Sequence, residues 1–145
     1  MSKRLPVPSR FTDGIEHWLE NLQISTYRFP FSPILDNTKK INVCIGDVHA
    51  DPRGLISSLY IGKCINNKGE WIGDNRRVIL LGDILDGLER IGKNPDITQY
   101  DELLCLRIIF ELKVEALKEG GDIIWVLGNH DVAAPMGHNH YLNKI

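Results

Sequence analysis

Val-Ile-Leu-Leu-Gly-Asp-Ile-Leu-Asp, residues 78–86, joins an apolar run directly to a glycine and two aspartates. The four apolar residues Val78 to Leu81 predict a short strand that is buried on both faces. Asp83 and Asp86 follow in the next loop. Ligands bind outside the carboxyl ends of parallel strands, so the stretch predicts a functional site at the end of a sheet strand.

Two other stretches repeat this arrangement of an apolar run followed by glycine and polar residues. Ile41 to Ile45 runs into Gly46-Asp47-Val48-His49. Ile123 to Leu127 runs into Gly128-Asn129-His130-Asp131. Glycine at such a position lets the backbone approach its neighbours closely, and we expect this at Gly46. The chain therefore predicts three buried strands with similar polar ends.

Two helices are predicted between these strands. Asp51-Pro52 is typical of an N-cap followed by proline at the first helical position, and the helix that it starts ends near Gly62. The second helix runs from about Gln99 to Lys118, with Thr98 as its cap and Gly120-Gly121 as its stop. Alternating strands and helices imply right-handed crossovers and a parallel sheet, which predicts an α/β fold.

The polar residues of the three strand ends are expected to converge, because carboxyl ends of parallel strands lie at one edge of the sheet. Their oxygen and imidazole groups suit a hard or borderline divalent metal. Asp86 can instead orient a histidine or cap a loop, and Asp131 can be a cap or a supporting group. The candidate set is Asp47, His49, Asp83, Asp86, Asn129, His130 and Asp131.

The three strand ends resemble the first three signature blocks of the calcineurin-like metallophosphoesterase superfamily, GD-x-H, GD-x-x-D and GNH-D/E. The resemblance covers about residues 41–137 and is greatest to serine/threonine phosphoprotein phosphatases of the bacterial-like type, because Trp71-Ile72-Gly73 precedes the second block. It implies a metallophosphoesterase-type sheet with flanking helices. This chain would supply the first βαβαβ half of a two-sheet α/β sandwich.

The resemblance also implies a mechanism and a set of ligands. His130, paired with Asp86, would protonate the leaving group while a metal-bound hydroxide attacks phosphorus. The implied cofactors are two divalent metal ions, manganese first, with iron or zinc as alternatives. The implied metal ligands are Asp47 and His49 for the first ion, Asp83 as the bridge, and Asn129 for the second ion and the phosphate.

Two residues depart from the family's pattern. Ala50 stands where GD-x-H-G has its last glycine, a mild change unless the backbone there has positive φ. Gly87 stands where the phosphoprotein phosphatases have an arginine that would clamp phosphate. Arg90 and Arg53 are candidate substitutes for phosphate binding, and the alternative for both is a solvated surface arginine.

The end of the chain contains Gly137-His138-Asn139-His140, which matches the family's closing GH-x-H block. This stretch begins only six residues after Asp131, which leaves no room for the strands that carry the block back to the metals. Short motifs match by chance. We therefore expect His138 and His140 to be a solvent-exposed pair, and if the tail folded back they could donate nitrogens.

Three hypotheses about function follow from the residues and the resemblance. The first is a metal-dependent phosphoesterase acting on a phosphorylated protein or a small phosphoester. The second is a truncated, inactive relative that acts as a binding module. The third is a nucleotide or dinucleoside-polyphosphate hydrolase, favoured by the absent arginine. A second chain or a C-terminal half would complete the domain.

Bulk composition bounds these hypotheses. The chain has 145 residues, of which 43% are hydrophobic and 25% are charged, as in an ordinary globular domain. Its net charge of −2 predicts no nucleic-acid or membrane surface. Three cysteines without a CxxC pair and an N-terminus without a signal-peptide core predict a cytoplasmic protein. We expect residues 1–40 to be a lead-in with one short helix and residues 41–145 to be a partial metallophosphoesterase domain.

Overall fold

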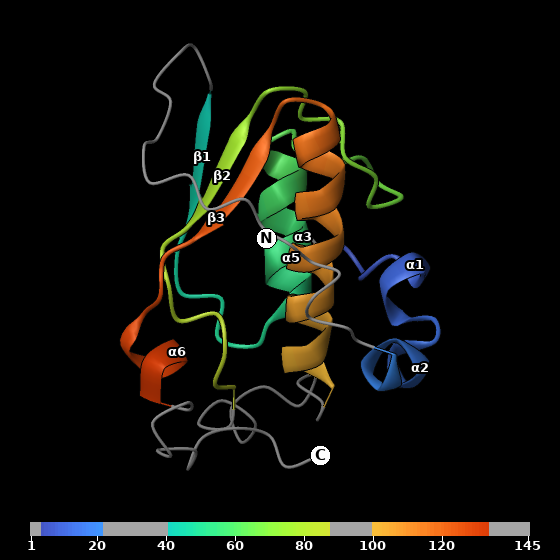
Figure 1. The fold of residues 1–145 in the computed structure, drawn as a ribbon, viewed down its shortest axis with the longest axis vertical. Helices are drawn as coiled ribbons and strands as arrows, with labels where there is room; N and C mark the ends of the chain where they lie inside the picture. Colours follow the sequence, from blue (N-terminus) through green and yellow to red (C-terminus); the bar gives the residue numbers. More distant parts are fainter. Residues whose placement is uncertain (1–3, 22–40, 88–99, 134–145) are drawn as a thin grey trace.

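A three-stranded parallel sheet forms the centre of the protein in a computed structural model, which describes residues 4–21, 41–87 and 100–133 (Figure 1). The strands are β1 (Asn42–Ile45), β2 (Arg77–Leu80) and β3 (Asp122–Trp125), in the order β1-β2-β3. Val43 pairs with Val78, which pairs with Ile123. The α/β fold and the three predicted strands are confirmed, each with its bounds shifted by one or two residues. The predicted burial is wrong for β1, where Asn42 and Cys44 are exposed, because no helix or strand of the described residues covers the second face of the sheet.

Two helices cover one face of this sheet, as Figure 1 shows. They are α3 (Pro52–Ile61) and α5 (Asp101–Lys118), which also contact each other. Leu59 on α3, Ile108 and Leu112 on α5 and Val78 and Leu80 on β2 are almost fully buried between these layers. Burying such a side chain contributes about 1.5–3 kcal/mol, so this layer is the main source of stability.

Helix α3 begins as the sequence predicts, because the Asp51 carboxylate accepts a hydrogen bond from the Gly54 N–H at 2.9 Å. Its end also lies where the sequence predicts, with Gly62 as the C-cap. Gly62 has φ −69°, so glycine is not needed there for its backbone conformation. It is needed because a larger residue would not fit, since an added Cβ would lie 2.8 Å from Val43 Cγ1. The left-handed residue is Lys63, with φ 56°. The N–H groups of Lys63 and Cys64 bond the carbonyls of Tyr60 and Leu59, which is a Schellman motif.

Replacing Lys63 by glycine should stabilise the protein. A left-handed non-glycine residue costs about 1–2 kcal/mol, and glycine would remove this cost. Glycine is also freer in the unfolded chain, which offsets about 0.4–1 kcal/mol of the gain. We expect the free energy of unfolding to rise by about 0.5–1 kcal/mol in urea denaturation. Lys68→Gly, at an exposed turn residue without positive φ, is the matched control and should not stabilise.

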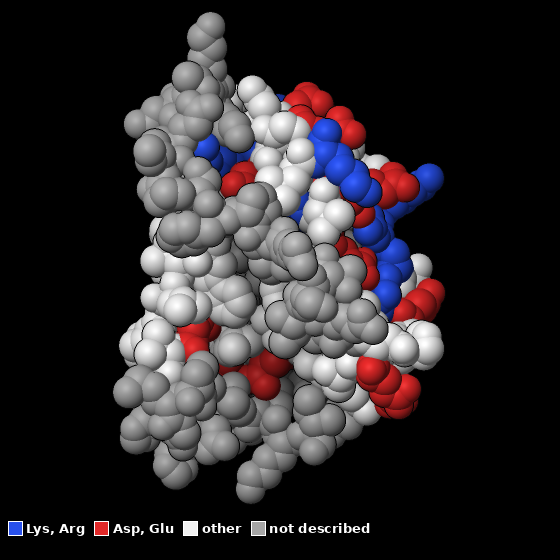
Figure 2. Space-filling model, in the orientation of Figure 1, with Lys and Arg blue, Asp and Glu red and all other residues white. Residues whose placement is uncertain are grey.

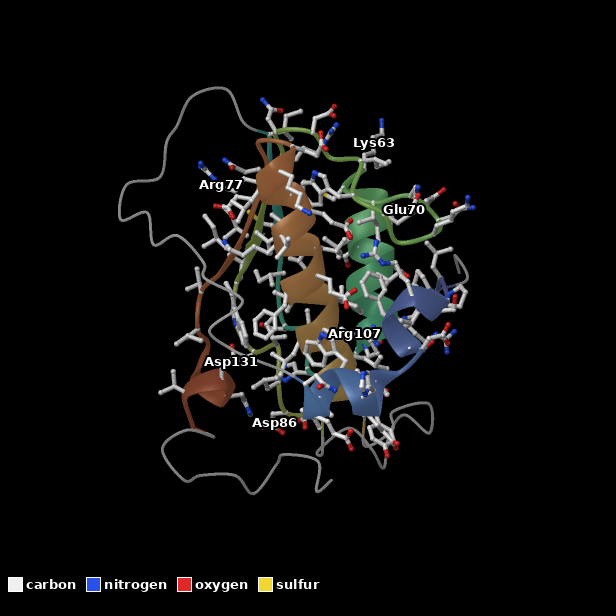
Figure 3. The ribbon with its side chains drawn as sticks, turned by 45° about the vertical axis from the view of Figure 1, so that its right-hand side comes forward. Lys63, Glu70, Arg77, Asp86, Arg107 and Asp131 are labelled. Carbon is white, nitrogen blue, oxygen red and sulfur yellow. The ribbon has the colours of Figure 1, made fainter. Side chains whose placement is uncertain are left out.

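The N-terminal segment packs on α5 through two short helices, α1 (Ser9–Thr12) and α2 (Ile15–Glu20), which replace the single predicted helix. Gly14, with φ 63°, separates them. Phe11 on α1 is completely buried. Arg107 on α5 donates to the carbonyls of Phe11 and Asp13 at 2.9 and 2.6 Å, and lies beside α1 and α2 in Figure 3. The expected division at residue 40 stays a prediction.

The second face of the sheet is covered by no helix or strand among the residues that the structure describes (Figure 1). Cys44 is exposed on β1. Leu81 and Val126, just beyond β2 and β3, are 54% and 50% exposed. Within the described ranges, no helix combines the length and the apolar character needed to cross a membrane.

Candidate active site at the strand ends

The loops that follow the three strands lie together at the end of the molecule to which the strands run, the lower end in Figure 1. The His49 N–H bonds the Asp83 carbonyl at 2.9 Å, and the Ala50 N–H bonds the Ile84 carbonyl at 2.8 Å. These bonds join the first loop to the second. Figure 2 shows acidic atoms recessed in this lower part of the surface. The predicted convergence of the first two strand ends is confirmed.

Five non-glycine residues of these loops have a left-handed backbone. They are Asp47, His49, Ala50, Asp83 and Asp86, with φ values of 45°, 46°, 52°, 51° and 74°. Strained backbone of this kind costs about 1–3 kcal/mol per residue and concentrates at functional sites. Ala50 therefore does occupy a conformation that glycine would adopt more easily, so its replacement of the pattern's glycine is not a mild change.

Two glycines allow the second and third loops to meet. A Cβ added to Gly82, whose φ is 99°, would lie 2.6 Å from Gly128 Cα. A Cβ added to Gly128 would lie 2.2 Å from Asp83 Oδ1 and 2.4 Å from the Asp83 nitrogen. Gly46 differs, because its added Cβ would have Leu81 Cδ1 at 3.9 Å as its nearest neighbour. The expected close approach at Gly46 is wrong, and the contact belongs to Gly82 and Gly128.

His130 and Asp86 form a hydrogen-bonded pair between His130 Nδ1 and Asp86 Oδ2. The carboxylate accepts, so Nδ1 carries the proton and Nε2 is the ring's other nitrogen. Asp86 is 5% exposed, and its Oδ1 is buried without a hydrogen-bond partner among the described residues. The His130 N–H bonds Asp83 Oδ1 at 3.0 Å. The His49 and His130 rings are edge to face, with centroids 5.3 Å apart.

Asp47, His49 and Asp83 are grouped so that one ligand atom from each lies within 4.8 Å of the others. Asp47 is exposed, His49 is buried and Asp83 is half-buried. Two carboxylates and an imidazole in this arrangement could hold a metal ion. Asn129 is exposed as the first residue of α6 (Asn129–Ala133), beside His130. The ligand roles of these residues stay predictions.

The structure shows supporting contacts for two carboxylates, Asp131, which the sequence offered as a cap or a supporting group, and Glu102, which it did not single out. Asp131 is 3% exposed and accepts hydrogen bonds from the loops after β2 and β3. Glu102, in the first turn of α5, accepts from the Asp86 and Gly87 N–H groups at 3.0 and 3.4 Å. The only sequence signal for Glu102 is that acidic residues are enriched in the first turn of a helix, and this says nothing about its partner.

The roles of the two candidate phosphate-binding arginines stay predictions. Arg53 lies in the first turn of α3 and is half-buried, and its proposed contact with phosphate stays a prediction. Arg90, His138 and His140 lie outside the described residues.

None of the chain's three cysteines belongs to these loops, because Cys44 lies in β1, Cys64 lies just after α3 and Cys105 lies within α5. Burial raises the pKa of the Cys64 thiol and raises that of Cys105 well above its usual value. Cysteine reacts as a thiolate, so these two side chains are inert core residues at neutral pH.

Comparisons with known proteins give a protein phosphatase likeness. The chain is 32% identical over 101 residues to Shewanella-like protein phosphatase 1 of Plasmodium berghei and 32% identical over 102 residues to Shewanella-like protein phosphatase 2 of Arabidopsis thaliana. Each match covers 70% of this chain but only 25% and 23% of the relatives. No protein-family model matches the chain.

Two solved structures share the fold. One is the cold-active protein-tyrosine phosphatase of a psychrophilic Shewanella species, with a TM-score of 0.59 and 21% identity over 80% of this chain and 35% of that one. The other is a point mutant of a cold-active protein tyrosine phosphatase, with a TM-score of 0.57 and 22% identity over 79% and 34% of the two chains. The TM-scores show a shared α/β fold, and at identities this low the likeness concerns the fold alone.

These findings correct the resemblance from the sequence. The matched relatives are Shewanella-like protein phosphatases, and the structural matches are described as tyrosine phosphatases, so the assignment to calcineurin-like metallophosphoesterases is overturned. The serine/threonine specificity and the pair of manganese ions, with iron or zinc as alternatives, are overturned with it, because they rested on that family alone and the structural matches are described as tyrosine phosphatases. The three short blocks are present in the sequence, but the family assignment that we based on them is wrong.

Proposed function

We propose that the chain carries the catalytic end of a protein phosphatase, a hydrolase of phosphoester bonds. The observation that carries the proposal is the hydrogen-bonded pair of His130 and Asp86 beside Asp83 at the strand ends. The likeness to two protein phosphatases over 70% of the chain supports it. Because the chain spans about a quarter of those relatives, activity in this length of chain is part of the proposal.

His130 would act as the general acid. Water attacks phosphorus, the bond from phosphorus to the leaving oxygen breaks, and His130 Nε2 gives its proton to that oxygen. Asp86 holds the Nδ1 proton and stabilises the charged imidazole before transfer. The water's own proton goes to solvent or to a carboxylate. Water is the nucleophile that these loops favour, because none of the three cysteines lies in them.

The charge at the site sets a condition on phosphate binding. Asp47 and Asp83 lie close together, and two carboxylates repel a phosphate dianion unless a cation or a proton is bound between them. The predicted ligand roles of Asp47, His49, Asp83 and Asn129 address this repulsion. A measurement of bound metal by mass spectrometry, with and without prior chelation, checks those roles independently of turnover.

The proposed substrate is a phosphorylated protein or a small phosphoester. The names of the two relatives support a phosphoprotein. Leaving-group chemistry favours phosphotyrosine, because a phenolate, with a pKa of about 10, leaves more easily than an alkoxide. A nucleotide or dinucleoside polyphosphate is the alternative substrate, and a binding module without turnover is the alternative function.

The deciding experiment measures phosphate release by the 145-residue chain from 4-nitrophenyl phosphate, a phosphotyrosine peptide, a phosphoserine peptide and a nucleotide. Each assay is run in chelator and with added divalent cations. We expect hydrolysis that Asp83→Asn lowers about 10- to 100-fold, since that carboxylate holds the His130 backbone. Asp74→Asn, at an exposed aspartate before β2, is the matched control and should keep the wild-type rate within twofold.

The outcomes separate the alternatives. Release that Asp83→Asn leaves unchanged would come from a contaminant and would contradict the proposal. Absence of release from every substrate would favour the binding module. Faster release from the nucleotide than from either peptide would replace the substrate class and keep the chemistry.

We further propose that the exposed second face of the sheet packs against a second layer, as in one half of a sandwich. The apolar side chains Leu81 and Val126 support this, and so does the greater length of the relatives. If nothing covers that face, the chain should self-associate, which sedimentation at two protein concentrations would detect.

A further inference from the structure

We infer that Asp131 is the positioning residue that sets the geometry of the His130–Asp86 acid pair, an inference that rests on the proposed phosphatase function. Asp131 is 3% exposed, and the sequence allowed only a cap or a supporting role for it. It touches neither ring nitrogen of His130 in the contacts that the structure gives. Its effect would therefore pass through the backbone of the two loops.

The Asp131 carboxylate accepts four hydrogen bonds, which fills the acceptor positions of both oxygens. Oδ1 accepts from the Ile84 and Leu85 N–H groups at 2.9 and 3.1 Å. Oδ2 accepts from the Gly128 N–H at 3.0 Å and from the Trp125 indole Nε1–H at 3.1 Å. A buried carboxylate with four donors is a rigid junction, because losing it would leave the buried Ile84 N–H and three half-buried N–H groups without this acceptor.

Three of the four donors lie in the loops after β2 and β3, which carry the acid pair, and the fourth is Trp125 at the end of β3. Ile84 and Leu85 precede Asp86, and Gly128 and Asp131 lie on either side of His130. Figure 3 shows Asp131 on the segment after β3 and Asp86 on the segment after β2, both at the lower end of the molecule. Asp131 Oδ1 thus holds the loop that carries the Asp86 carboxylate, and Asp131 Oδ2 holds the loop that carries the His130 imidazole.

Asparagine at position 131 would disrupt this junction with almost no change in size. Its carbonyl oxygen can accept from one pair of N–H groups, but its NH₂ group would face the other pair, donor against donor. One loop would have to move away from the other. A displacement of about 1 Å in a catalytic group can lower the rate about 100-fold, so a small shift at His130 is sufficient.

The test compares Asp131→Asn with Asp122→Asn, the same change at the opposite end of β3, where the carboxylate accepts from Lys113. We expect kcat for phenyl phosphate to fall about 10- to 100-fold in Asp131→Asn, with a smaller loss for 4-nitrophenyl phosphate, whose leaving group needs less protonation. Loss of folded protein would instead lower both rates by one factor. Asp122→Asn should change neither rate more than twofold.

A second readout is independent of turnover. In ¹⁵N spectra of the imidazole side chains at one pH, the His130 Nδ1 signal of the wild type should show the hydrogen bond to Asp86. That signature should be lost in Asp131→Asn and kept in Asp122→Asn. If the wild type hydrolyses nothing, the proposed function fails while this spectrum still decides the junction. If the spectrum and the leaving-group ratio are both unchanged in Asp131→Asn, the inference is wrong.

Discussion

Replacing His130 by glutamine should lower kcat for phenyl phosphate about 10²- to 10⁴-fold, which is the usual contribution of a general acid. Glutamine is close in size to histidine but has no proton to give to the leaving oxygen. Hydrolysis of 4-nitrophenyl phosphate should fall much less, because its more acidic phenol departs without protonation. The measurement is steady-state phosphate release from both esters, and the quantity of interest is the ratio of the two losses.

His17→Gln provides the matched control, since His17 is exposed on α2 and bonds only Asn21 in the contacts described for it. It should leave both rates within twofold of the wild type. An equal loss for the two esters in His130→Gln would show that the residue binds phosphate or supports the loop. The general-acid assignment would then be abandoned, and Asp86 would be left as a structural partner.

Replacing Gly128 by alanine should strongly destabilise the protein. The new methyl group would lie 2.2 Å from Asp83 Oδ1 and 2.4 Å from the Asp83 nitrogen. The nitrogen belongs to the backbone, which is held by the His49 N–H bond to the Asp83 carbonyl, so it cannot simply turn away. We expect the free energy of unfolding to fall by about 3 kcal/mol, at the upper end of overpacking effects, and Tm by about 6–12 °C.

Gly46→Ala is the control, because it is the same change at a strand-end glycine whose added Cβ would meet its nearest neighbour, Leu81 Cδ1, at 3.9 Å. Thermal unfolding followed by circular dichroism should place Gly46→Ala within about 2 °C of the wild type, as expected for a substitution worth less than about 0.5 kcal/mol. If Gly128→Ala has the same Tm as Gly46→Ala, the loops after β2 and β3 are not packed as closely as the structure shows.

Local patterns explain what could be predicted from the sequence. Each strand contains three consecutive apolar residues, and short apolar runs of this kind are a local signal for a strand. Asp51-Pro52 carries its start signal within three residues, because the Asp51 side chain bonds the Gly54 N–H. The approach of the first two polar strand ends followed from the rule that carboxyl ends of parallel strands lie at one edge.

Contacts between distant residues explain what could not be predicted. Asp131 bonds Ile84 across 47 positions, and Glu102 bonds Asp86 across 16 positions, and neither pairing has a local signal. The docking of Phe11 on α5 likewise depends on Arg107, 96 positions away. The family assignment failed for a related reason. Short blocks around Asp83 and His130 match by their chemistry, while the relatives were found by identity along 101 residues.

The α/β class, the parallel sheet and the places of Asp83, Asp86 and His130 at strand ends follow from the sequence alone, because hydrophobic periodicity and the alternation of strands and helices can be read along the chain. The bond between His130 and Asp86, which the resemblance implied, is present in the structure. The contact of Gly82 with Gly128 and the bond of Asp131 to Ile84 could be learned from the tertiary structure alone. The physical reason is that hydrogen bonds and steric contacts act over about 3 Å. They are therefore set by where two loops finally lie, and not by the spacing of their residues along the chain.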